Sequence, residues 1–109
     1  MRKIEQQMNE AILNRKDFFK GNTSVQHYTT ETGAREAIVK LHGNHIASVR
    51  DTLQICDAGW QTVTTKSRLN ALLNEFAEGC YVFQKIFDWF LGDAEGYVLP
   101  FPTEEFVTV

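Results

Sequence analysis

Residues 41–48 read LHGNHIAS, and this stretch decides the fold. A Gly-Asn pair between β-rich segments is typical of a two-residue hairpin loop, in which the turn requires positive φ angles. The loop predicts strands over residues 36–42 and 45–50 and sets their register. The predicted cross-strand pairs are His42 with His45, Leu41 with Ile46, and Val39 with Ser48. The three aliphatic members of these pairs then share the core face of the sheet.

This register places both histidines on the outer face, where three interpretations are open. Cβ atoms of a cross-strand pair lie about 5 Å apart, so the imidazoles could share a metal ion or act as an acid–base pair. A structural zinc site needs about four protein ligands and a catalytic site about three. Beyond His27, the chain offers only scattered acids without ligand spacing. We therefore interpret the stretch as a plain turn and predict no metal and no cofactor.

The chain also lacks the common signatures of catalytic sites. It contains no GxSxG elbow, no phosphate-binding GxxxxGK[ST] loop, no GxGxxG and no HExxH. Its two cysteines, Cys56 and Cys80, are far apart and have no CxxC spacing, which is typical of small buried residues rather than a redox pair. We expect no catalytic residue, and we expect that the protein is not an enzyme.

Two helices are predicted on either side of the hairpin. Ile4, Met8, Ala11 and Ile12 form one apolar stripe, which predicts a helix over about residues 3–16. The second helix carries the strongest signal, with Leu69, Leu72, Leu73 and Phe76 at helical spacing. We expect Thr64 or Thr65 to cap its start and Gly79 to follow its end. Further strands are predicted over residues 25–30 and 53–55.

The C-terminal part is aromatic and less regular. Residues 80–85 predict a strand, whereas 86–91 fit either its continuation or a helical turn, and 97–99 fit a returning strand. The order of elements predicts an α+β two-layer domain, with a mostly antiparallel sheet of about four to six strands and two helices on one face. We expect a single domain over residues 1–109, with a body at 1–85 and an acidic aromatic hairpin or edge segment at 86–109.

Charge divides the chain in the same way. All 11 Lys and Arg lie in residues 1–85 beside nine acids, while residues 86–109 hold five acids and no base. Neither part has the dense basic face of a nucleic-acid binder or the acidity of a DNA mimic. No apolar run approaches a membrane span, and the N-terminus has no signal-peptide core, so we expect a cytoplasmic protein.

Two surfaces are candidates for binding. If the C-terminal strand alternates without interruption, Tyr81, Phe83, Phe87 and Trp89 project to one side, either as core or as an exposed protein-binding patch. The start of the second helix, with Lys66 and Arg68, is a candidate phosphate contact. The candidate binding residues are Trp60, Lys66, Arg68, Tyr81, Phe83, Phe87 and Trp89.

The segments KIEQQMNEAI, GNT, LHGNHIA and GWQTVTTKSRLNALL, in that order over residues 1–85, resemble small uncharacterised proteins of tailed bacteriophages, including phages of marine hosts. The resemblance implies a viral accessory protein in the cytoplasm of an infected bacterium and brings no catalytic residues. We therefore predict a non-enzymatic protein that binds an unidentified protein partner, or binds a second copy of itself to form a homodimer. The alternative is a weak nucleic-acid-binding protein that uses the start of the second helix.

Overall fold

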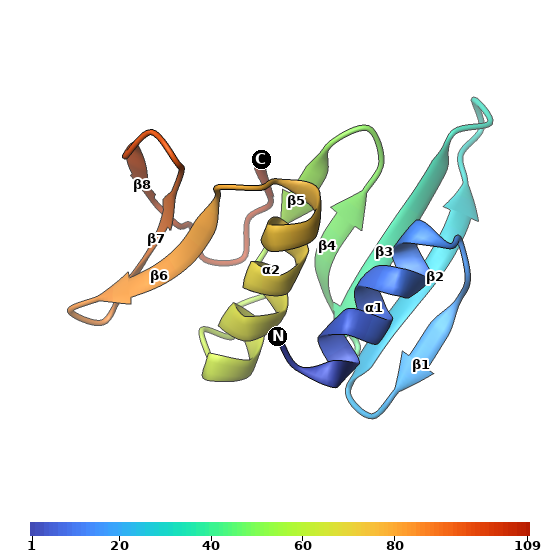
Figure 1. Ribbon diagram of the computed structural model, residues 1–109, viewed down its shortest axis with the longest axis horizontal. Coiled ribbons are helices and arrows are strands. Elements are labelled where there is room, and N and C mark those ends of the chain that lie inside the picture. Colours follow the sequence, from blue (N-terminus) through green and yellow to red (C-terminus); the bar gives the residue numbers. More distant parts are fainter.

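The computed structural model describes residues 1–109 and contains two α-helices and nine β-strands (Figure 1). In chain order the elements are α1 Lys3–Leu13, β1 Phe18–Lys20, β2 Thr23–Thr29, β3 Arg35–Leu41, β4 Asn44–Val49, β5 Leu53–Ile55, α2 Val63–Phe76, β6 Tyr81–Lys85, β7 Asp88–Gly92, β8 Val98–Pro100 and β9 Val107–Thr108. The α+β class with a mostly antiparallel sheet is confirmed. The C-terminal hairpin forms a second sheet of three strands rather than extending the first.

The main sheet has six strands in the order β1-β2-β3-β4-β5-β9, and every neighbouring pair is antiparallel. Strands β1 to β5 follow one another along the chain, as short hairpin connections favour. The C-terminal segment then returns, and Val107 pairs with Ile55. Strand β9, residues 107–108, therefore forms an edge of the main sheet.

Both helices cover the same face of this sheet (Figure 1). From the helices, Met8, Leu69 and Leu72 are fully buried, and from the sheet Val39 and Ile55 are fully buried beneath them. The helix boundaries differ slightly from the prediction. Helix α2 is capped by Thr62, whose Oγ1 accepts a hydrogen bond from the backbone N–H of Thr65 at 3.1 Å. Helix α1 ends at Leu13 because Arg15 turns into the left-handed region, with φ of 56°.

The predicted register of the β3–β4 hairpin is wrong by one residue. The turn is made by His42 and Gly43, with φ angles of 54° and 80°, so Leu41 pairs with Asn44 and Lys40 with His45. Histidine tolerates the left-handed conformation better than most residues, which lets it take the first turn position. The two histidines are therefore not a cross-strand pair.

A β-bulge restores the core face despite this shift. The register changes between Lys40 and Val39, and Val39 pairs with Ala47, which leaves Ile46 as the extra residue. Val39, Leu41 and Ile46 are all buried, so the predicted core residues are correct although their pairing is not. Ala47, the partner of Val39, is also fully buried.

The second sheet, residues 81–100, is here called the arm, and it lies beside α2 on the side away from β1 (Figure 1). It is fixed to α2 by Asn70, whose amide donates to the carbonyl of Val82 at 2.9 Å and accepts from the N–H of Val82 at 2.7 Å. The indole of Trp89 packs 6.1 Å from the ring of Phe101, and both are buried. The side chain of Asn70 thus occupies hydrogen-bonding groups at the edge of β6 that a further strand would use.

Candidate functional site

The arm presents an aromatic surface to solvent. Tyr81, Phe83 and Phe90 form a row in which successive ring centroids lie 5.5 Å apart. In the register of the arm, Tyr81 pairs with Gly92, and a Cβ on Gly92 would lie 2.8 Å from the Tyr81 ring. Gly92 therefore leaves room for this ring to lie across the sheet. We call Tyr81, Phe83, Phe90, Val98 and Pro100 the outer aromatic face, because their register places them together on the side opposite Val82.

The predicted alternation along the arm is wrong beyond Lys85. Ile86 and Phe87 form a two-residue turn, so Gln84 pairs with Trp89 and Phe83 with Phe90. This turn moves Trp89 to the inner side, where it is 4% exposed in the core, and moves Phe90 to the outer side. Of the predicted aromatic residues, Tyr81, Phe83 and Phe87 thus reach the surface and Trp89 does not.

The turn itself is the most unusual feature of the backbone. Ile86 and Phe87 have φ angles of 49° and 71°, a region that glycine and asparagine occupy readily but a β-branched residue rarely does. Their side chains are 80% and 87% exposed, at the tip of the arm. The chain thus combines unfavourable backbone angles with two large apolar side chains in water. Such strain is concentrated at functional sites in proteins.

Arg68, predicted on an exposed helical face, lies inside the protein and is 3% exposed. Its Nη1 is 2.8 Å from Oε2 of Glu5, which is 2% exposed, and its Nε donates to Thr23 Oγ1 at 3.0 Å. The same Glu5 oxygen accepts a hydrogen bond from Ser67 Oγ at 2.5 Å, and Oε1 accepts one from the N–H of Arg2 at 3.1 Å. This buried network joins the two helices to the start of β2.

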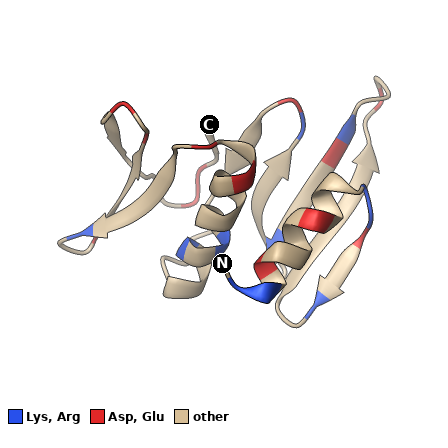
Figure 2. Ribbon diagram, in the orientation of Figure 1, with Lys and Arg blue, Asp and Glu red and all other residues tan.

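The predicted phosphate contact at the start of α2 loses Arg68 to this network. Lys66 remains in the first turns of the helix and is half-buried. The other basic residues lie at both ends of α1, on β1 and β3, after β4 and at the tip of the arm, and Figure 2 shows acidic residues among them. Nucleic-acid backbones are bound by clustered basic side chains. With Arg68 buried, Lys66 is the remaining basic side chain of the predicted contact.

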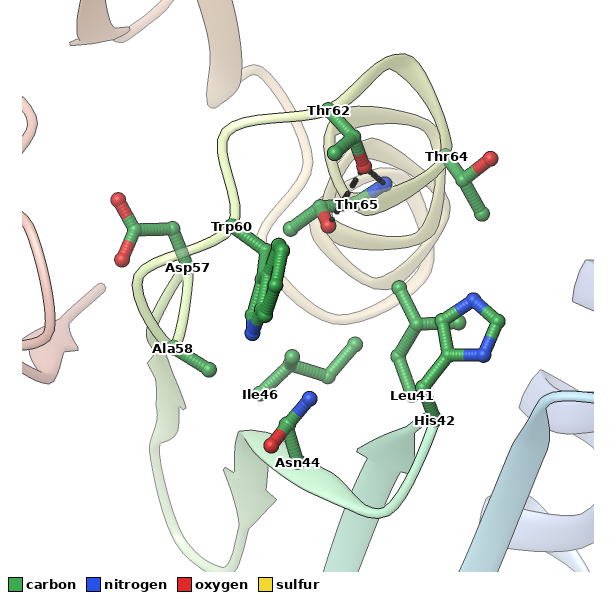
Figure 3. Close-up of a pocket in the computed structure, with 10 residues that line it drawn as sticks. All are labelled: Leu41, His42, Asn44, Ile46, Asp57, Ala58, Trp60, Thr62, Thr64 and Thr65. Carbon is green, nitrogen blue, oxygen red and sulfur yellow. Dashed lines mark hydrogen bonds between the residues drawn. The ribbon is translucent and has the colours of Figure 1, made fainter.

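Trp60 lines a pocket between the β3–β4 turn and the start of α2 (Figure 3). The pocket has a volume of about 510 Å³. Its residues are Leu41, His42, Asn44, Ile46, Asp57, Ala58, Trp60, Thr62, Thr64 and Thr65. Eight of the ten belong to the segments LHGNHIA and GWQTVTT, so two pieces of the sequence resemblance meet at this pocket. The indole of Trp60 is 60% exposed and forms one wall.

A histidine and a serine meet on the outer face of the main sheet. Nε2 of His45 lies 2.8 Å from Oγ of Ser48 and 2.9 Å from the carbonyl oxygen of Ala47. The carbonyl oxygen only accepts, so Nε2 carries a proton and donates to both oxygens. The serine hydroxyl is therefore not activated by a neighbouring base, as a nucleophile requires. The ring of Phe106 also covers His45, with centroids 4.6 Å apart.

Three further polar or reactive side chains, those of His27, Asp57 and Cys56, have structural roles. His27 Nε2 lies 3.1 Å from the carbonyl of Ala11. The fully buried Asp57 accepts hydrogen bonds from Gly59, Gln61 and Glu104, which holds the C-terminal segment against the loop before α2. Burial raises the pKa of the Cys56 thiol, which favours the unreactive protonated form. No three His, Cys, Asp or Glu side chains group closely enough to hold a metal ion.

Comparison with known families gives the origin of the chain. The family model described as Kyanoviridae Gp96 protein matches residues 1–108. The chain belongs to this family. The predicted resemblance to phage proteins is thereby confirmed, and it extends beyond residue 85 through the arm and β9. No curated protein sequence and no solved structure matches the chain. Neither helix is long and apolar enough to cross a membrane.

Sequence reasoning missed two members of these surfaces. Uninterrupted alternation from Tyr81 places Phe90 on the opposite face of the strand, whereas the turn at Ile86 and Phe87 returns it to the same face as Tyr81. Uninterrupted alternation also places Ile86 on the face opposite Tyr81, because turn preferences indicate no two-residue turn at an isoleucine. The two large apolar residues between Lys85 and Asp88 are the sequence feature that indicates an exposed position for Ile86.

Proposed function

We propose that this phage protein is a non-enzymatic binding protein, and that its arm recognises a protein partner in the infected bacterium. The tip at Ile86 and Phe87 carries the proposal, because folding alone does not account for two exposed apolar side chains on an unfavourable turn. Apolar and aromatic side chains that become buried dominate the energy of protein interfaces. The outer aromatic face continues from the tip along the arm and supplies the remaining contact area.

Charge around the arm supports recognition of a protein rather than of nucleic acid. Residues 81–100 hold Asp88, Asp93 and Glu95 and a single base, Lys85. An acidic surface repels phosphate groups, whereas aromatic surfaces with few charges at their centre are typical of protein interfaces. The same proposal includes a second copy of the chain as the partner.

The proposal is tested with one matched pair of variants. Phe87→Ser removes an apolar side chain at the tip, and Phe19→Ser removes one of similar exposure, 82%, from the opposite end of the molecule. We expect the protein recovered from infected-cell lysate by the unaltered chain to be lost with Phe87→Ser and kept with Phe19→Ser. Sedimentation of the purified chain identifies the case in which the partner is another copy. Identical recovery with both variants would contradict the proposal.

Backbone strain in the turn at Ile86 and Phe87 can be measured separately from partner binding. Ile86→Asn with Phe87→Gly provides the residues that a two-residue hairpin turn prefers. We expect the free energy of unfolding of this double variant to be about 1–3 kcal/mol higher than that of the unaltered chain, because a strained turn residue costs on that order. Chemical denaturation followed by circular dichroism measures the change. We also expect the double variant to recover no partner protein from infected-cell lysate. A free energy of unfolding that is unchanged or lower would show that the turn is unstrained.

A further inference from the structure

We infer that the pocket beside Trp60 binds an uncharged heteroaromatic ring of the nucleobase class. Its volume of about 510 Å³ falls within the range of roughly 300–1,000 Å³ found for ligand pockets. Leu41 and Ile46 form the floor, and the indole of Trp60 stands over them (Figure 3). The pocket thus has a flat aromatic wall and an aliphatic floor, which fit a planar ring. This site is separate from the arm and does not depend on its function.

The exposed indole points to stacking. Trp60 is 60% exposed, whereas the only other tryptophan, Trp89, is buried. Trp60 forms no aromatic pair within the protein, so its ring face remains open to a ligand. Bases stack on such rings with an affinity gain of about tenfold to hundredfold per ring, whatever the base.

The rim of the pocket supplies polar groups that can read the edge of a ring. The side chains of His42, Asn44 and Thr64 line the pocket, and none of them makes a hydrogen bond within the protein. Each of these groups can donate and accept. Nucleobase edges alternate donors and acceptors over a similar width. The left-handed turn at His42 and Gly43 places His42 and Asn44 at this rim.

The charge of the pocket defines the ligand further. The lining contains no Lys, Arg or Glu, and its single carboxylate, Asp57, is already engaged by three hydrogen-bond donors and turned away from Trp60 (Figure 3). The pocket therefore has no lysine or arginine for a phosphate and no free carboxylate for a charged amine. The base is therefore the part of the ligand that the pocket is expected to recognise.

The inference is tested by titrating adenosine, guanosine, cytidine and thymidine separately into nitrogen-15-labelled full-length protein. The spectrum contains two indole N–H signals, and the buried Trp89 serves as the internal reference. We expect at least one nucleoside to shift the Trp60 signal and the amides of Asn44 and Thr64 in a saturable manner. No saturable shift with any of the four at millimolar concentration would overturn the inference.

Variants show whether the binding occurs at this pocket. Binding to the variants is measured from the shifts of the amide signals. Trp60→Leu is expected to weaken nucleoside binding by about tenfold or more. Asn44→Ala is expected to change the preference among the four nucleosides, which a purely structural role would not do. Tyr97→Leu replaces another exposed aromatic residue and should leave binding unchanged. A Trp60 signal that moves with protein concentration, and not with nucleoside, would instead show that a second copy fills the pocket and would overturn the inference.

Discussion

Replacing Arg68 with alanine is expected to lower the free energy of unfolding by about 3–5 kcal/mol, because it leaves the carboxylate of Glu5 buried without its cation. Glu5 is held in place by α1 and Arg68 by α2, so neither helix can expose the charge without separating from the other. Urea denaturation followed by circular dichroism measures the loss. The comparison variant is Lys66→Ala, at a position two residues earlier on the same helix, for which we expect a change within about 0.5 kcal/mol.

A double variant shows that the loss arises from the unpaired charge. Glu5→Met with Arg68→Met removes both charges and retains much of the volume, and such replacements of buried ion pairs are often neutral or stabilising. We expect the double variant to be more stable than Arg68→Ala, although Ser67 and Thr23 lose hydrogen-bond partners. A double variant as unstable as the sum of the two single variants would contradict this account.

Replacing Trp89 with alanine is expected to lower the free energy of unfolding by about 3–5 kcal/mol, because it leaves a large cavity between the arm and the core. The indole packs against Phe101, so the cavity would lie where the arm meets the chain leading to β9. Thermal and urea unfolding give the loss of stability. Amide exchange at Val82 shows in addition whether the arm separates from α2.

The neighbouring aromatic residues provide the control for this prediction. Phe87→Ala and Tyr97→Ala remove exposed rings of the same segment, and we expect changes within about 0.5 kcal/mol. The three variants thus divide the aromatic C-terminal segment into core and surface. Equal losses for all three would mean that the arm is packed differently from the structure described here.

Local patterns in the sequence were sufficient for both helices, for strands β2 to β6 and β8, and for most of the core, but not for β1, β7 or β9. The leucine spacing of α2 and the alternation around Val39 and Leu41 report burial directly, because apolar residues recur with the period of the element that buries them. Gly43 predicts the position of the β3–β4 turn to within one residue. These features depend on residues close together in the chain.

The errors arose where a distant partner or a backbone exception decides the outcome. Arg68 is buried because Glu5, far earlier in the chain, neutralises it, and helical periodicity contains no information on such a partner. The hairpin turn is made by His42 and Gly43 rather than by Gly43 and Asn44, and Ile86 takes a left-handed position that β-branched residues seldom occupy, so register and parity changed beyond these turns. The Trp60 pocket is assembled from two segments separated by β5, which only the folded chain brings together.

The order of strands in the main sheet also has a consequence for folding. From β1 to β5 each strand joins its predecessor through a short loop, so little chain entropy is lost when each pair closes. Pairing of β9 with β5, and contact between α1 and α2, must instead close long loops. We therefore expect the five-strand meander to form early in folding, and the closing strand and the buried ion pair to form later.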